Sequence, residues 1–162
     1  MFPADLTDLA SQVLDKARQS RVKIATAESC TGGLVAACLT EIAGSSDVVE
    51  RGFVVYSNEA KSEMLGVSAD LIERHGAVSA EVARALAEGA IARSRAELSV
   101  AITGIAGPGG GSLEKPVGLV HFAAMRTGQE PVLERHEFGD IGRGNIREAS
   151  IKVALRLLSG LL

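Results

Sequence analysis

The sequence predicts an α/β protein: one domain over residues 1–162, built as an α/β/α sandwich with a mixed β-sheet. Short apolar runs alternate with segments of helical periodicity, which gives a β-α-β pattern early in the chain. The last two apolar runs are joined by a linker too short for a parallel crossover, so an antiparallel pair is expected beside the parallel strands. The chain is 46% hydrophobic but only 3% aromatic, so aliphatic side chains must fill its core.

The first third of the chain predicts a helix followed by a β-α-β unit. Apolar residues at helical spacing indicate an amphipathic helix that ends near Ser20. A strand is then expected over 22–27, a helix over 33–42 and a valine-rich strand over 47–56. The apolar face of the first helix consists of Leu6, Leu9, Val13, Leu14 and Ala17.

The remaining elements follow from caps, glycines and apolar runs. Ser79 is a favoured N-cap residue for a longer helix. A linker near Thr127-Gly128 joins two strands as a hairpin. In chain order we expect helices over 58–65, 68–74 and 79–94, a strand over 98–103, a glycine-dense loop over 104–112, strands over 117–125 and 132–138, and a closing helix over 146–158.

Composition argues against several classes of partner. The formal net charge is −3, the charges are mixed along the chain, and four Phe and one Tyr offer little surface for base stacking, so we expect no nucleic-acid partner. No apolar run approaches the ~20 residues of a membrane span, and the N-terminus lacks a signal pattern, so we expect a cytoplasmic protein without a membrane partner. Cys30 and Cys38 have neither zinc nor disulfide spacing, which predicts reduced, buried thiols.

A polar turn, TAESCTGG at residues 26–33, separates the first strand from the next helix. Ser29 would then lie at the mouth of a helix N-terminus, where unpaired N–H groups can hold an anion or an oxyanion, so it is a candidate nucleophile. The alternative is that Ser29 or Thr31 is an N-cap and that Gly32 and Gly33 only permit close packing. The turn alone leaves both interpretations open.

A second polar segment, YSNEAK at residues 56–61, follows the second strand. Open α/β sheets bind ligands at the carboxyl ends of their strands. Lys61, on the helix expected to begin here, could turn toward that edge of the sheet. The alternatives are a solvated Lys61 and a Tyr56 that is a half-buried cap of the core.

The glycine-dense loop fits neither a P-loop nor a dinucleotide-binding fingerprint, because it has no Gly-Lys pair and Ser112 stands at the third glycine position. Its bare N–H groups could still hold a phosphate or a carboxamide. Lys115, Arg143 and Arg147 could add positive charge, although Arg147 could equally form a structural salt bridge. The three histidines have no metal or triad spacing, so no metal and no Ser-His-Asp triad are expected.

Five motifs in order resemble the CinA C-terminal domain family. They are TAESCTGG (26–33), YSNEAK with LGV (56–67), GAVSAEVA (76–83), ITGIAGPGGGSLEKPVGLV (102–120) and GRGNIR (142–147). The resemblance implies a stand-alone nicotinamide-nucleotide amidase, which hydrolyses nicotinamide mononucleotide to nicotinate mononucleotide and ammonia in pyridine-nucleotide salvage. It also implies that Ser29 is the nucleophile and that Lys61, with Tyr56 nearby, forms the base region.

We expect a small-molecule nucleotide substrate, no cofactor and a homo-oligomer. Which loop holds the oxyanion and which the phosphate stays open, as does the choice between Tyr56 and Lys61 as the proximal base. Competing hypotheses are a non-enzymatic partner protein associated with competence or recombination, and a hydrolase of another nucleotide amide or a phosphate ester with Cys30 as nucleophile. The expected substrate-binding residues are Thr31, Gly32, Gly33, Thr103, Gly104, Gly107, Gly109, Gly110 and Arg143.

Overall fold

The computed structural model describes all 162 residues and contains one five-stranded sheet with the strand order β2-β1-β3-β4-β5. β1 pairs in parallel with β2 and with β3, whereas β3–β4 and β4–β5 are antiparallel. The predicted mixed sheet and the predicted C-terminal hairpin are therefore confirmed. The strands are β1 (Ile24–Glu28), β2 (Val49–Val54), β3 (Leu98–Gly104), β4 (Leu119–Arg126) and β5 (Val132–Glu137).

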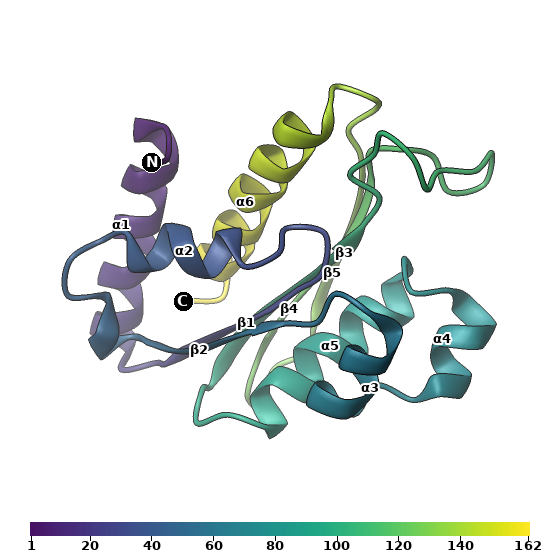
Figure 1. Ribbon diagram of the computed structural model, residues 1–162. Coiled ribbons are helices and arrows are strands. Elements are labelled where there is room, and N and C mark those ends of the chain that lie inside the picture. The colour runs from purple at the N-terminus through teal and green to yellow at the C-terminus, as the bar shows by residue number, and fades with distance from the viewer.

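Helices cover both faces of this sheet, as the α/β/α prediction requires. Figure 1 shows α1, α2 and α6 on one face and α3, α4 and α5 on the other. The helices are α1 (Ala4–Ser20), α2 (Leu34–Thr40), α3 (Asn58–Leu65), α4 (Ala69–His75), α5 (Ala80–Ala92) and α6 (Arg143–Gly160), with a 3₁₀ turn η1 (Ser45–Asp47). None of these helices is both long and apolar enough to cross a bilayer.

The core consists of two apolar clusters, one on each face of the sheet, because successive strand side chains point to opposite faces. Leu98, Val100 and Ile102 of β3 pack with α1, α2 and α6. The fully buried apolar residues of β1, β3 and β4 on the α5 face are small, namely Ala25, Ala27, Ala101 and Ala123, whereas β2 contributes Phe53. Both cysteines are free and buried, as predicted.

Most element boundaries differ from the sequence-based expectation by one to three residues. The second strand is shorter than 47–56, because η1 includes residue 47 and β2 spans Val49–Val54. The closing helix begins at Arg143, before the expected residue 146, because Gly142 adopts a positive φ of 90° and opens the helix without a side-chain cap. This earlier start places Arg143 and Arg147 in the first two turns of α6.

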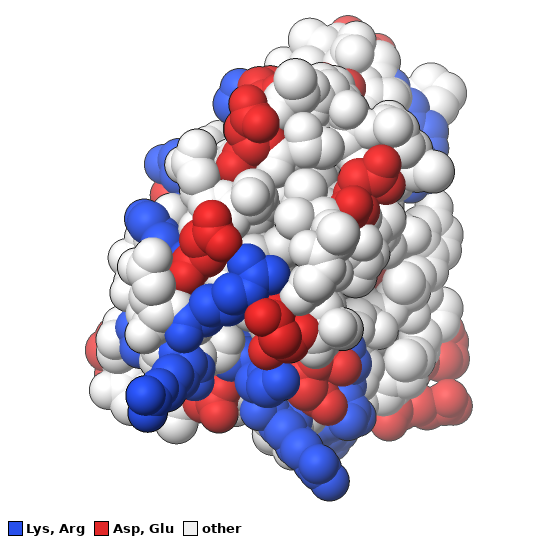
Figure 2. Space-filling view, turned by 90° about the vertical axis from the view of Figure 1, so that its left-hand side faces the viewer, with Lys and Arg blue, Asp and Glu red and all other residues white.

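Charges of both signs are interleaved on the surface. On the face shown in Figure 2, Lys and Arg side chains lie among Asp and Glu side chains. Ion pairs on the surface of the protein include Arg18–Asp47 and Arg84–Glu88. Attraction of an anion must therefore come from local groups.

Gly89 in the middle of α5 is required by a close approach of two elements. A Cβ at this position would overlap the backbone carbonyl oxygen of Leu65 at the end of α3. Gly89→Ala is expected to lower the free energy of unfolding by about 1–3 kcal/mol, although Ala is the better helix former. Gly144→Ala in α6, where a Cβ meets open space, should not lower it. Urea denaturation of both variants tests this, and equal or higher stability of Gly89→Ala would contradict it.

Candidate active site

The carboxyl ends of β1, β2 and β3 meet at one edge of the sheet, and a pocket of about 270 Å³ lies there. The first turn after β1 leads to α2 on one face, while the chain after β2 leads to helices on the other face. Such a switch point leaves a crevice between strand ends. The residues that line the pocket are Ser29, Cys30, Tyr56, Asn58, Lys61, Ala77, Val78, Thr103, Gly104, Ile105, Ala106, Gly107, Gly109, Gly110 and Arg143.

Ser29 is the first residue after β1, and its position is fixed by the backbone. Its N–H donates to the carbonyl oxygen of Ile102 in β3 (3.0 Å), and only 8% of the residue is exposed. Its Oγ lies 3.3 Å from Nζ of Lys61. The N–H groups of Cys30 and Thr31, which follow, donate no hydrogen bond within the chain. A hydroxyl beside an amine and next to free N–H groups is the arrangement that acyl transfer requires.

Lys61 is buried, with 2% of the residue exposed, so the solvated alternative is wrong. Ser57 caps α3 by accepting the N–H of Ala60 (3.0 Å), and this start places Lys61 at the end of the first turn, above the strand edge. Its Nζ donates to the carbonyl oxygens of Tyr56 (3.2 Å) and Ser57 (3.4 Å).

The environment of Lys61 favours a neutral amine. Burial lowers the pKa of Lys61, and the smaller charge effects of Cys30 and Glu59, which act to raise it, do not offset this. No carboxylate lies within ion-pair distance of Nζ. A neutral amine can give one N–H to each of the two carbonyls and keep its lone pair for the Ser29 hydroxyl. Lys61 is thus suited to be a general base.

Tyr56 contributes its backbone to the contact with Lys61, and its side chain is 64% exposed. The half-buried core cap considered from the sequence is therefore wrong. Tyr56 lies on the wall of the pocket, but the group in contact with the Ser29 hydroxyl is the amine of Lys61.

Cys30 is a poor candidate nucleophile. The residue is 6% exposed, and burial raises the pKa of its thiol to about 12. At neutral pH it is a thiol, and the thiolate is the nucleophilic form.

The N–H groups of Gly32 and Gly33, which the sequence offered as donors to an anion, already donate hydrogen bonds within the chain. The N–H of Gly32 donates to the carbonyl oxygen of Ser29 (3.0 Å). The N–H of Gly33 donates to the carboxylate of Glu28 (3.0 Å), which the sequence analysis did not single out. Gly32, Gly33 and Thr31 do not line the pocket. Both glycines have positive φ, 60° and 95°, so the tight turn itself requires them.

The glycine-dense loop forms the opposite wall. The N–H groups of Gly107, Gly109 and Gly110 donate no hydrogen bond within the chain and are available to a ligand. Thr103 also lines the pocket, but its hydroxyl donates to the carbonyl oxygen of Ala77 (2.8 Å). Gly104 ends β3 beside it.

The three cations suggested by the sequence have different roles in the structure. Arg143 lines the pocket and donates from Nη1 to the carbonyl oxygen of Gly107 (2.9 Å). Arg147 donates from Nη2 to the carbonyl oxygen of Thr31 (2.9 Å) and forms no salt bridge. Lys115 donates to the carbonyl oxygens of His75 (2.7 Å) and Val78 (2.9 Å). Only Arg143 among them reaches the pocket.

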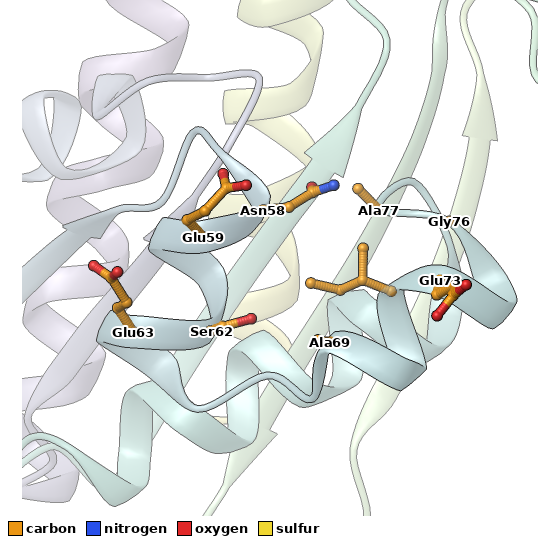
Figure 3. A pocket seen from close by; sticks show the side chains of 9 residues that line it. Asn58, Glu59, Ser62, Glu63, Ala69, Glu73, Gly76 and Ala77 are labelled. Carbon is orange, nitrogen blue, oxygen red and sulfur yellow. The ribbon is translucent and has the colours of Figure 1, made fainter.

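A larger cavity of about 560 Å³ adjoins the pocket between α3 and α4. Its wall carries Glu59 and Glu63 of α3 and Glu73 of α4, and Figure 3 shows Asn58 at the start of α3 with its amide directed toward Ala77. Asn58 and Ala77 line both spaces. Because its charged residues are all acidic, this cavity is unfavourable for a phosphate.

The structure groups no three His, Cys, Asp or Glu side chains in a way that could hold a metal ion. The pocket offers the hydroxyl of Ser29, the buried amine of Lys61, free N–H groups and the guanidinium of Arg143, beside the protonated thiol of Cys30. Together these features define a three-layer α/β protein with a serine–lysine pair at the switch point of its sheet.

The chain belongs to the CinA C-terminal domain family, which it matches over residues 6–162, as its motifs predicted. It is 46% identical over 159 residues to the nicotinamide-nucleotide amidohydrolase PncC of Escherichia coli, and this alignment covers 98% of the chain and 95% of PncC. It is 49% identical to a CinA-like protein of Syntrophobacter fumaroxidans, covering 93% of the chain but only 35% of that longer protein. The chain thus spans about a third of the longer relatives.

Solved structures agree with the fold. The competence/damage inducible protein CihA of Agrobacterium tumefaciens has a TM-score of 0.98 and 51% identity, with 99% of this chain and 98% of that chain covered. A CinA superfamily protein of Escherichia coli has a TM-score of 0.92 and 34% identity, with 100% of this chain and 94% of that chain covered.

The buried Lys61 predicts a pH-dependent stability difference. Its folded-state pKa is lowered, so the unfolded chain, with a lysine pKa of about 10.4, binds the proton more tightly. Stability is therefore lost as the pH falls from about 10.4 through the folded-state pKa. Lys61→Met should be more stable than wild type at pH 7, and the difference should shrink toward pH 10. Denaturant titrations at both pH values measure this, with the exposed Lys16→Met as control; a gain in Lys61→Met that does not change with pH would contradict it.

Proposed function

We propose that this protein hydrolyses the carboxamide of nicotinamide mononucleotide to nicotinate mononucleotide and ammonia. The observation that carries the proposal is the 3.3 Å contact between the Ser29 hydroxyl and the buried Lys61 amine in a pocket at the sheet edge. The PncC relative supports the substrate class, because it aligns over nearly its whole length. We place the reaction in pyridine-nucleotide salvage in the cytoplasm, with a homo-oligomer as the working form and no cofactor.

The first half of the reaction forms an acyl-enzyme. Lys61 Nζ takes the hydroxyl proton of Ser29 while Oγ attacks the carboxamide carbon, and the carbonyl oxygen becomes an oxyanion. The protonated Lys61 then gives its proton to the amide nitrogen, the C–N bond breaks and ammonia leaves. In the second half, Lys61 deprotonates a water that attacks the ester carbon, the bond from that carbon to Oγ breaks with release of nicotinate mononucleotide, and Lys61 returns the proton to Ser29.

Free backbone donors on the two walls suit the two anionic parts of the substrate. The N–H of Cys30 follows Ser29 directly and belongs to a residue that lines the pocket, which favours it for the oxyanion. The N–H groups of Gly107, Gly109 and Gly110, with Arg143 beside them, favour the phosphate. A non-enzymatic partner role gives no reason to bury Lys61 against a serine.

Replacement of the nucleophile tests the reaction. Ser29→Ala should lower kcat for ammonia release from nicotinamide mononucleotide by at least about 10³-fold, because the attacking oxygen is removed. Cys30→Ala is the matched neighbour and should keep most activity, since its thiol is protonated at neutral pH. Full activity in Ser29→Ala together with loss in Cys30→Ala would reverse the assignment.

Recognition of the phosphate is tested by the substrate and by the loop. Free nicotinamide and nicotinamide riboside should be poor substrates, because they lack the group that the glycine wall and Arg143 would bind. Gly109→Leu should raise KM about tenfold or more with a smaller effect on kcat, since a Cβ fits there without a clash and the side chain would occupy the phosphate side. Gly160→Leu, at the end of α6, is the control. Equal kcat/KM for the riboside and the mononucleotide would refute this use of the loop.

A further inference from the structure

Glu28, the last residue of β1, is a fully buried carboxylate directly before Ser29. Its Oε2 accepts the N–H groups of Gly33 and Val35, both at 3.0 Å, and its Oε1 accepts the N–H of Ala36 at 2.9 Å. No Lys, Arg or His lies within ion-pair distance. Burying a charge without a counter-ion is costly, so these three N–H donors and the positive end of α2 must offset its desolvation.

This contact is more than an ordinary helix cap. The N-cap position of α2 is Gly33, and a Ser or Asp at an N-cap position normally accepts the first helical N–H groups locally. Glu28 performs this function from five residues upstream. Its side chain therefore links the end of β1 to the first turn of α2. The turn between these two points contains Ser29, Cys30 and Thr31.

The backbone of the same turn is held from three other elements. The carbonyl oxygen of Glu28 accepts the N–H of Val55 after β2 (2.9 Å), and the N–H of Ser29 donates to Ile102 in β3 (3.0 Å). Arg147 of α6 donates to the carbonyl oxygen of Thr31 (2.9 Å). With these contacts made, the N–H groups of α2 are occupied, whereas those of Cys30 and Thr31 are free.

We propose that Glu28 is a positioning residue for Ser29. Its carboxylate sets the turn so that the Ser29 hydroxyl faces the Lys61 amine and the free N–H group of Cys30 remains available to the oxyanion. The inference rests on the proposed function for its role in turnover, but the reactivity of Ser29 can be measured without the natural substrate. A shift of about 1 Å in a reacting group can cost a factor of about 10² in rate.

Glu28→Gln is the informative variant. It keeps the shape and one acceptor oxygen, but its NH₂ group would face a backbone N–H, so one side of the contact to α2 is lost. We expect kcat for ammonia release to fall about 10- to 100-fold with KM within about threefold of wild type. The rate at which a fluorophosphonate probe labels Ser29, followed by mass spectrometry, should fall by a similar factor. Glu28→Asp keeps the charge on a shorter side chain, so its kcat and its labelling rate should lie between those of wild type and Glu28→Gln.

Cys38→Ala is the matched control, because Cys38 is buried in α2 beyond the residues that Glu28 binds, and its thiol lies against the carbonyl oxygen of Leu6 in α1 (3.8 Å). It should lower the melting temperature and leave both rates unchanged. Unchanged labelling in Glu28→Gln and Glu28→Asp would overturn the inference, as would an equal loss in Cys38→Ala. An unlabelled Ser29 in wild type would also overturn it.

The pH profile separates positioning from an electrostatic effect on Lys61. If Glu28 acts through the turn, the acid limb of the kcat profile stays at the same pH in Glu28→Gln while the plateau falls. A shifted limb with an unchanged plateau would overturn positioning. Wild type that is labelled at Ser29 but releases no ammonia from nicotinamide mononucleotide would refute the proposed function and leave the inference about Glu28 supported by labelling alone.

Discussion

The burial of one amine without a counter-ion constrains the arrangement of the whole site. Lys61 can lie beside Ser29 only because two backbone carbonyls at the end of β2 receive its N–H groups, and because Ser57 starts α3 at that point. A carboxylate in the same place would raise the pKa of the amine and keep it protonated near neutral pH, so that it could not accept the proton of Ser29. Glu59, whose charge acts to raise the pKa of Lys61, lines the cavity between α3 and α4 and forms no ion pair with it. The site thus depends on keeping charge away from Lys61 as much as on bringing Lys61 to Ser29.

Helix α6 links the two walls of the pocket although most of it lies far from the chemistry. Two of its arginines, one turn apart, donate to backbone carbonyls on opposite sides: Arg143 to Gly107 and Arg147 to Thr31. Neither contact is an ion pair, and both depend on α6 beginning at Gly142. The first turns of α6 therefore fix the spacing between the nucleophile turn and the glycine loop.

The sequence predicted the elements better than their contacts. Periodicity located all five strands and six helices, and motif order identified the family, because both are local properties of the chain. The burial of Lys61, the capping of α2 by Glu28 and the contacts of Lys115 with residues 75 and 78 depend on how elements pack in three dimensions. An acidic residue just before a glycine-rich turn was a signal for Glu28, but nothing in its spacing indicated three backbone partners.

The width of the pocket depends on the size of four alanine side chains on one face of the sheet. Ala25, Ala27, Ala101 and Ala123 let α5 approach closely, and α5 is preceded by Ala77 and Val78, which form part of the pocket wall. Thr103, at the end of β3, is tied to the carbonyl oxygen of Ala77. A larger side chain under α5 would lift the helix and carry this wall with it, since packed interiors transmit strain. Pocket width is thus set partly by methyl groups that never meet a substrate, and evolution can tune it there without altering any reacting group.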